Sequence, residues 1–371
     1  KIFNVVFGPP DPNGENTATA DGEIIWGFVD PLKKDPVEPH VLATLPNADK
    51  TAPLGWGSAS VFTEGHYAWW IVPHMKKKEC QVLSVVSVNW RNGKARVQDV
   101  TLPMSIEGLR TYALTCDADG QAILSLGGTD PKTKKDGWAE QVSLLVRMAP
   151  EGAAETATVK VPGAHAGCVA CRLDEGGSAR CVGFAVREDK ATPAIIHTTW
   201  TGGAITWTVD ELDEERTRQL CDHARDPKEM SDPKPSKSDA KERTQALSTA
   251  LARMRPIELD RTPNGDLLFV GEVQVRNDFL ADGSGGTQAG NVRDQILYAV
   301  LPQDGAARTG VVRKYLVEEG PPGYGAVVNT TVMTAGDRIY FLFNDWEKHA
   351  FASGATPTDK YARINVATLE G

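Results

Sequence analysis

Two consecutive β-hairpins predicted between residues 257 and 316 constrain the fold more than any other part of this sequence. Each hairpin consists of an apolar strand, a turn and a second apolar strand, and the turns contain Asn264-Gly265 and Asp304-Gly305. Such turns require positive φ, which Gly adopts without a Cβ clash and which Asn and Asp tolerate. The run LLFVG at residues 267–271 is typical of a strand covered on both faces, whereas the second hairpin mixes apolar and polar residues. Four strands of these kinds predict one blade of a β-propeller.

The same pattern recurs along the chain. Inner hairpins are expected to begin near residues 58, 108, 167, 256 and 326, and residues 22–45 form a sixth, irregular unit. Alternating strands with a glycine turn in each hairpin favour a propeller over a sandwich. We therefore predict an all-β chain in which residues 1–371 form a single β-propeller domain of six blades, with five or seven left open. The strand at residues 1–6 is expected to supply the outer strand that is missing after the last inner hairpin.

Residues 210–255 interrupt the repeat and are predicted to be a helical-hairpin insertion. A first helix is expected at residues 211–224, and Ser238 or Asp239 is expected to cap a second. The second helix carries an apolar stripe at helical spacing, formed by Leu247, Ala250, Leu251 and Met254. Two interpretations remain open: the insertion packs against its own propeller, or it is a docking arm for another subunit.

Composition and charge exclude several classes of partner. The chain has a formal net charge of −9, with 41% hydrophobic and 24% charged residues, which is ordinary globular composition. An acidic chain without a cluster of Lys and Arg is a poor match for nucleic acid or an anionic membrane. The densest basic run, Lys76 to Lys78, is explained by a hairpin turn. No apolar run reaches the roughly 18 residues of a membrane span.

The chain begins at Lys1 rather than Met, which fits the removal of a signal peptide. We therefore expect a protein that is secreted, or that lies at the cell surface or in the periplasm.

The cysteines allow three interpretations. Cys168 and Cys171 form a CxxC, which Cys181, Cys221 and His223 could complete as a zinc site. A disulfide between Cys181 and one of that pair is favoured over zinc, and buried free thiols are the third possibility. The six cysteines are Cys80, Cys116, Cys168, Cys171, Cys181 and Cys221.

No cofactor is predicted, although the sequence leaves calcium possible. The turn Asp117–Gly120 has the look of a calcium loop, but no further oxygen ligands follow at the required positions, so a hairpin turn is the better interpretation. The loop 277–294 is the second candidate, because it carries Asp278, Asp282, Asn291 and Asp294.

No catalytic motif stands out. The stretch 55–59 does not match the G-x-S-x-G of serine hydrolases, and the seven histidines form no HxH or HExxH pair. Glycoside hydrolysis needs two facing carboxylates. Acids near inner strands supply the candidates, which are Glu258, Asp260, Glu272, Asp337 and Asp345.

Two adjacent tryptophans are candidate binding residues. Trp69 and Trp70 must point to opposite faces of a strand, so one packs in the core and the other is free to act as an aromatic anchor. With the apolar stripe of the insertion, the predicted binding residues are Trp69, Trp70, Leu247, Leu251 and Met254.

A stretch near the C-terminus is similar to a known group of proteins. The sequence GDRIYFLFND at residues 336–345, together with GDLLFVGE at residues 265–272, resembles uncharacterised secreted propeller-like proteins of bacteria. The resemblance covers residues 255–345. It implies a propeller fold and an exported location, and it implies no reaction.

Because no catalytic set is evident, the sequence favours an exported, non-enzymatic propeller that acts as a protein-binding or scaffold subunit at the cell surface or in a larger assembly. The alternatives are a carbohydrate-active propeller enzyme that uses carboxylates at the central channel, and a small-ligand binding module.

Overall fold

The computed structural model describes residues 2–8, 22–29, 40–45, 67–89, 92, 94–134, 140–161, 163–174, 177–187, 192–221, 251, 254–262, 264–277, 291–302, 307–312, 330–336, 338–346 and 362–370. Regular structure in these residues is nearly all β, with the α-helix α1 (Glu214–Cys221) and the short 3-10 helix η2 (Pro131–Thr133) as the helical elements. None of the described helices has the length and apolar character that crossing a membrane requires.

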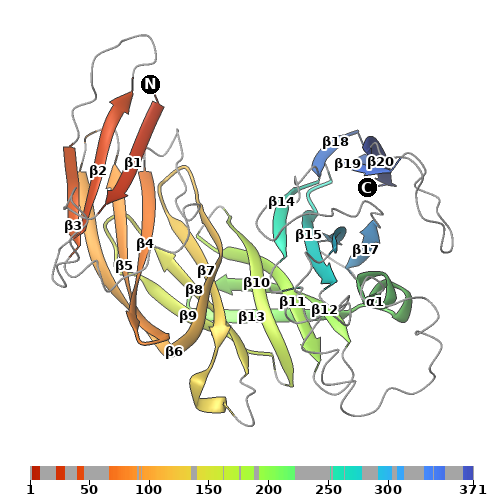
Figure 1. Cartoon of the computed structure of the whole chain (residues 1–371), viewed down its shortest axis with the longest axis horizontal. Helices are drawn as coiled ribbons and strands as arrows, with labels where there is room; N and C mark the ends of the chain where they lie inside the picture. The colour runs from red at the N-terminus through yellow and green to blue at the C-terminus, as the bar shows by residue number, and fades with distance from the viewer. Residues whose placement is uncertain are drawn as a thin grey trace, which may run out of the picture. The chain divides into compact units, whose positions relative to one another are not determined.

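The described strands form five sheets (Figure 1). The first contains β1 (Ile2–Gly8), β2 (Gly22–Val29) and β3 (His40–Leu45), and the second contains β4 (Tyr67–Lys76), β5 (Glu79–Asn89), β6 (Lys94–Cys116), β7 (Ala122–Thr129), β8 (Gln141–Met148) and β9 (Glu155–Val159). The third contains β10 (Ala164–Leu173), β11 (Ala179–Arg187), β12 (Pro193–Thr201) and β13 (Ala204–Glu211). The fourth contains β14 (Arg255–Arg261), β15 (Leu267–Asn277), β16 (Asn291–Leu301) and β17 (Arg308–Val312), and the fifth contains β18 (Thr331–Ala335), β19 (Arg338–Trp346) and β20 (Ala362–Glu370).

Strand order in every sheet follows chain order, and each strand pair with a defined register is antiparallel. A succession of antiparallel meanders is the organisation of propeller blades. The predicted fold class, an all-β chain of the β-propeller kind, is confirmed. The number of blades stays a prediction.

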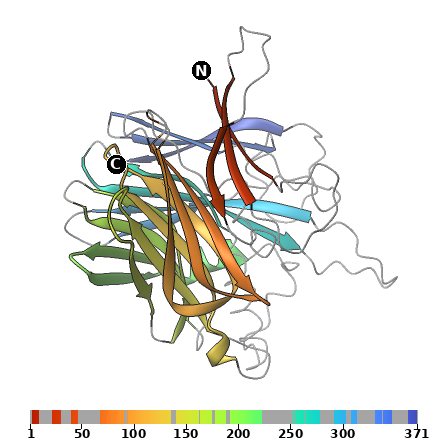
Figure 2. The same cartoon turned by 90° about the vertical axis from the view of Figure 1, so that its left-hand side faces the viewer.

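One long strand departs from the sequence prediction. The sequence predicts separate strands at residues 95–102 and 109–114, but β6 runs without a break over 23 residues. It pairs with β5 and then with β7, and its ladder with β5 shifts register where Pro103 lies, between the partners Thr101 and Ile106. Proline has no backbone N–H for a ladder, which explains the interruption at this point. In the second view the strands from β4 to β8 again run side by side (Figure 2).

The predicted turns are confirmed where they are described. Gly120 and Gly265 have φ of +82° and +86°, the left-handed region expected between hairpin strands. The lysine run also lies in a hairpin turn, between β4 and β5, where Lys77 has a φ of +61°. The second predicted turn of the opening pair, at Gly305, lies outside the described residues.

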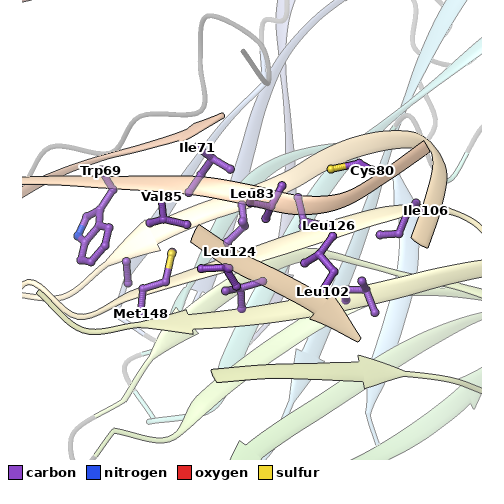
Figure 3. Close-up of a cluster of buried hydrophobic side chains, with 14 of the residues drawn as sticks. Trp69, Ile71, Cys80, Leu83, Val85, Leu102, Ile106, Leu124, Leu126 and Met148 are labelled. Atoms are coloured by element: carbon purple, nitrogen blue, oxygen red, sulfur yellow. The ribbon is translucent and has the colours of Figure 1, made fainter. Parts of the chain in front are cut away.

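The chain divides into two compact units. The first contains residues 1–160, 171–181 and 199–206, and the second contains residues 161–170, 182–198 and 207–371. The core of the first unit gathers apolar side chains from β4 to β8 around Trp69, Leu83 and Leu124 (Figure 3). In the second unit, Leu268, Val270 and Ile296 of one sheet pack against three large apolar side chains of the next, which are Ile339, Phe341 and Phe343.

The N-terminal strand does not take the predicted place beside the last strand. β1 pairs with β2 over its whole length, from Ile2 opposite Val29 to Gly8 opposite Glu23, and belongs to a separate sheet from β20. Pairing of β1 with β2 closes a much shorter loop than pairing of β1 with β20 would, and a shorter loop costs less conformational entropy to close. The expectation that residues 1–6 complete the last sheet is wrong.

A disulfide joins Cys171 in β10 to Cys181 in β11. This confirms the prediction of a disulfide between Cys181 and one member of the CxxC. The disulfide also uses Cys171 and Cys181, which are two of the four cysteines of the predicted zinc set. The prediction of a zinc site there is therefore wrong. Cys168 is a buried free thiol.

The two ends of the insertion that the structure describes pack against the fourth sheet of the same chain. Arg216 of α1 donates a hydrogen bond of 2.9 Å to the carbonyl oxygen of Thr309 in β17. At the other end, Leu251 and Met254 are buried, and a Cβ added at Gly271 of β15 would overlap the Met254 side chain. These contacts favour the packing interpretation over a docking arm. Leu247 and the cap of the second helix lie outside the described residues.

Candidate functional site

Three of the five candidate acids lie on one face of the hairpin β14–β15. Glu258 pairs with Val270, and Asp260 pairs with Leu268. Directly paired residues share a face and side chains alternate along a strand, so Glu258, Asp260 and Glu272, two residues after Val270, share that face. We call these three residues the acid row.

The acid row borders the apolar contact between the fourth and fifth sheets. Val270 and Leu268, the direct partners of Glu258 and Asp260, belong to the cluster that packs against Ile339 and Phe341. Figure 1 shows the two sheets in teal to light blue and in darker blue. Since β14 is the end strand of its sheet, Glu258 and Asp260 lie where this apolar contact meets the sheet edge.

Glu258 and Asp260 have unequal environments. Burial raises the pKa of the half-buried Glu258 carboxyl above its ordinary 4.5, and the neighbouring charge of Asp260 raises it further. Asp260 is exposed, and its Oδ1 accepts a hydrogen bond of 2.7 Å from the backbone N–H of Arg261. Glu258 and Asp260 are therefore two neighbouring carboxyl groups that differ in exposure, the kind of pair that acid–base chemistry on carboxyl groups uses.

Glu272 is enclosed. Its side chain is 2% exposed, and its Oε1 accepts a hydrogen bond of 2.8 Å from Oγ1 of Thr330, the residue before β18. A buried carboxylate needs such a donor, because removal from water is costly otherwise. Its burial keeps Glu272 from direct contact with a bound molecule.

The side chains of the other two candidate acids lie outside what the structure describes. Asp337 lies outside the described residues, and Asp345 lies on β19 opposite Arg363 of β20.

The structure also brings together three residues that the sequence analysis had not combined. Ser84 of β5 donates a hydrogen bond of 2.6 Å to Oδ1 of Asp99 in β6, and Nε2 of His74 in β4 lies 2.6 Å from the same hydroxyl oxygen. Because the serine proton is directed to Asp99, His74 donates to Ser84. In a catalytic triad the histidine lies between the acid and the serine and accepts the serine proton. The order here is different, because Ser84 lies between His74 and Asp99, and Ser84 is buried.

The predicted binding residues are mostly interior. Trp69 is 2% exposed, and its indole N–H donates a hydrogen bond of 3.1 Å to the Gly120 carbonyl. Leu251 is 1% exposed and Met254 is 5% exposed. The chain would have to open before a partner could reach these three side chains. Trp70, on the opposite face from Trp69, is partly exposed, and its role in binding stays a prediction.

The two calcium candidates have different outcomes. The turn after β6 is a hairpin turn, as predicted: the backbone N–H of Gln121 donates to Oδ1 of Asp117 at 2.8 Å. Burial raises the pKa of the Asp117 carboxyl. Most of the loop 277–294 lies outside the described residues, so calcium there stays a prediction. Among the residues that the structure describes, no group of three or more His, Cys, Asp or Glu side chains converges on a common point.

Comparison with known proteins gives structural likenesses alone. No protein-family profile matches the sequence, and no curated protein does. Among solved structures, the chain is similar to the GH93 α-L-arabinofuranosidase of Fusarium graminearum (12% identity, 76% of each chain covered, TM-score 0.36). It is also similar to the α-L-arabinanase of Penicillium chrysogenum (11%, 82% of this chain and 80% of that one, TM-score 0.36) and to a GH43_1 enzyme of Xanthomonas citri (12%, 86% and 89%, TM-score 0.33).

At such low identities and TM-scores these likenesses carry no argument about the reaction of this chain. They do correct one prediction. The three solved structures named above are carbohydrate-active enzymes rather than scaffold proteins, so the interpretation as a non-enzymatic protein-binding or scaffold subunit is not retained.

Proposed function

We propose that the chain hydrolyses glycosidic bonds, with Glu258 and Asp260 as its two working carboxyl groups. The observation that carries this proposal is the acid row, in which burial and Asp260 raise the pKa of Glu258 while Asp260 itself is exposed. This was the alternative function that the sequence analysis left open.

The two carboxyl groups have complementary roles. Glu258, protonated to higher pH than an ordinary glutamic acid, donates its proton to the glycosidic oxygen as the bond to the leaving group breaks. Asp260, as the carboxylate, takes a proton from the attacking water and stabilises the positive charge that develops on the sugar ring. Because they lie two residues apart on one strand, Glu258 and Asp260 project from the same face, so that both carboxyl groups can reach one glycosidic bond.

The charge of the chain favours a neutral substrate. With a net charge of −9 and no basic cluster in the sequence, the chain would repel a polyanionic glycan. We therefore propose neutral oligosaccharides as substrates.

The test is a panel of chromogenic glycosides, including α-L-arabinofuranosides and β-xylosides, with three variants. Glu258→Gln and Asp260→Asn preserve shape and remove the acid, and each should lower kcat/KM by about 100-fold or more. Asp119→Asn, which removes an exposed acid at the turn after β6, is the matched control and should keep wild-type activity. Wild-type activity in Glu258→Gln, or no cleavage of any glycoside, would overturn the proposal.

We also propose that the protein is exported. The Cys171–Cys181 disulfide supports this location, because disulfides persist in oxidising compartments and are rare in the cytosol. The resemblance of residues 255–345 to secreted bacterial propeller-like proteins agrees with it.

A further inference from the structure

Strand β14 contains one extra residue at the acid row. Pro256 pairs with Gly271 and Glu258 pairs with Val270, so the register of β14 with β15 shifts at Ile257. This is a β-bulge, in which two residues of one strand lie opposite one residue of the other. Here Ile257 and Glu258 are the two residues, and Val270 is the one. Bulges re-aim side chains and occur often beside active sites, so this bulge decides what lies next to Glu258.

The bulge turns Ile257 to the face that carries Glu258. In a regular strand, consecutive residues project to opposite faces of the sheet. The side chain of Ile257 nevertheless packs against the apolar cluster that contains Val270, the direct partner of Glu258. Ile257 and Glu258 therefore lie next to each other on one face, and Val270 lies opposite both.

This arrangement limits the access of water to Glu258. Because β14 is an end strand of the fourth sheet, a carboxyl group on it has a neighbouring strand on one side only. On that side Val270 is fully buried, at 0% exposure, and along β14 itself the half-buried Ile257 is the next side chain. Glu258 is half-buried in spite of its place at the edge, and burial is the larger cause of its raised pKa. Apolar side chains around a carboxyl group disfavour its ionised form.

We infer that Ile257 is a positioning residue for the proposed proton donor: the bulge places its side chain beside Glu258, where it shields that carboxyl group from water. The catalytic meaning of this inference rests on the proposed hydrolysis.

The other charged residues around Glu258 are the same in every variant that tests this inference. Asp260 of β14 and Glu272 of β15 share the face of Glu258, and Arg255 pairs with Glu272 in the ladder. The fifth sheet contributes apolar side chains to the contact with this face. A change in the titration of Glu258 that appears when Ile257 alone is replaced is therefore an effect of Ile257.

The direct test is the titration of the Glu258 carboxyl group, followed by NMR with isotope-labelled glutamate and assigned by the signal lost in Glu258→Gln. In Ile257→Ala, which removes most of the shielding side chain, the midpoint should move to lower pH, toward the ordinary 4.5. Ile257→Val keeps a branched apolar side chain and should titrate as the wild type does. Val312→Ala is the matched control, because Val312 packs against the same cluster from β17, the opposite end strand, and this variant should leave the midpoint unchanged.

The pH profile of hydrolysis gives a second readout on the same variants. A general acid must be protonated, so activity falls as pH rises through its pKa. The fall of kcat/KM at high pH should therefore move to lower pH in Ile257→Ala and stay in place in Ile257→Val and Val312→Ala. A merely structural role would lower the melting temperature of Ile257→Ala and move neither the titration nor the pH profile.

The outcomes distinguish this inference from the proposed function. An unchanged Glu258 midpoint in Ile257→Ala would overturn the inference even if glycosides are cleaved. An equal shift in Val312→Ala would also overturn it, because the effect would then come from looser packing of the whole cluster. A shift confined to Ile257→Ala, in a protein that cleaves no glycoside, would remove the hydrolase proposal and leave the shielding of Glu258 by Ile257 in place. If Ile257→Ala does not fold, Ile257→Thr, which has the shape of Val but carries a hydroxyl, provides the same comparison with Ile257→Val.

Discussion

Replacing Gly120 by Ala should destabilise the first unit far more than the same change at Gly203. Both glycines lie in turns with almost the same backbone, at φ of +82° and +84°. An L-residue in this left-handed region costs about 1–2 kcal/mol in either position. The surroundings differ: a Cβ added at Gly203 has nothing within 4 Å, whereas a Cβ at Gly120 would overlap the Tyr67 ring.

The second penalty can be given a magnitude. The hydrogen bond from Trp69 to the Gly120 carbonyl holds the turn in place, so the Tyr67 ring, whose Cδ2 would lie 2.3 Å from the added Cβ, is the group that has to shift. Overpacking of this kind costs about 1–3 kcal/mol. We therefore expect a loss of about 1–2 kcal/mol in the free energy of unfolding for Gly203→Ala, and of about 2–5 kcal/mol for Gly120→Ala.

The assay is urea unfolding followed by tryptophan fluorescence, in which Trp69 reports on the first unit. Adding Tyr67→Ala should remove the clash, so that Gly120→Ala in that background costs about as much as Gly203→Ala. Equal losses for the two glycine variants in the wild-type background would refute the argument from the Tyr67 ring.

Three other predictions follow from single features. Lys77→Gly should raise the free energy of unfolding by about 1 kcal/mol, because Lys77 has a φ of +61°, where an L-residue is strained; an unchanged urea midpoint would contradict this. Because the folded-state pKa of Glu258 is raised, ionisation of this carboxyl group opposes folding. Below the ordinary pKa of 4.5 the wild type and Glu258→Gln should therefore have the same pH dependence of the free energy of unfolding, and as pH rises through the folded pKa the wild type should lose stability relative to the variant. Parallel curves of stability against pH for the two proteins would refute this prediction. Mass measurement after alkylation of the unfolded, unreduced protein should show at most four modified cysteines of the six, given the Cys171–Cys181 disulfide; six would refute it.

The sequence by itself determined the all-β class and the positions of its turns. Residues such as Gly120 and Gly265 act locally, because a two-strand turn needs positive φ whatever surrounds it. The alternation of apolar and polar residues likewise predicts strands without knowledge of their neighbours. The disulfide between Cys181 and one member of the CxxC could be predicted for a similar reason, because these cysteines lie within one predicted hairpin.

Register and burial were decided only by the tertiary structure. Ser84 lies opposite Asp99 because β5 pairs with β6 in one particular register. If that register shifted by one residue, Ser84 and Asp99 would each lie opposite a different residue. The five candidate acids looked equivalent in sequence, but pairing of β14 with β15 places three of them on one face, and burial then raises the pKa of Glu258. Trp69 and Trp70 were likewise interchangeable until the packing of β4 placed Trp69 in the core. A side chain's face and its access to water depend on contacts between strands that lie far apart in sequence, and no local pattern records those contacts.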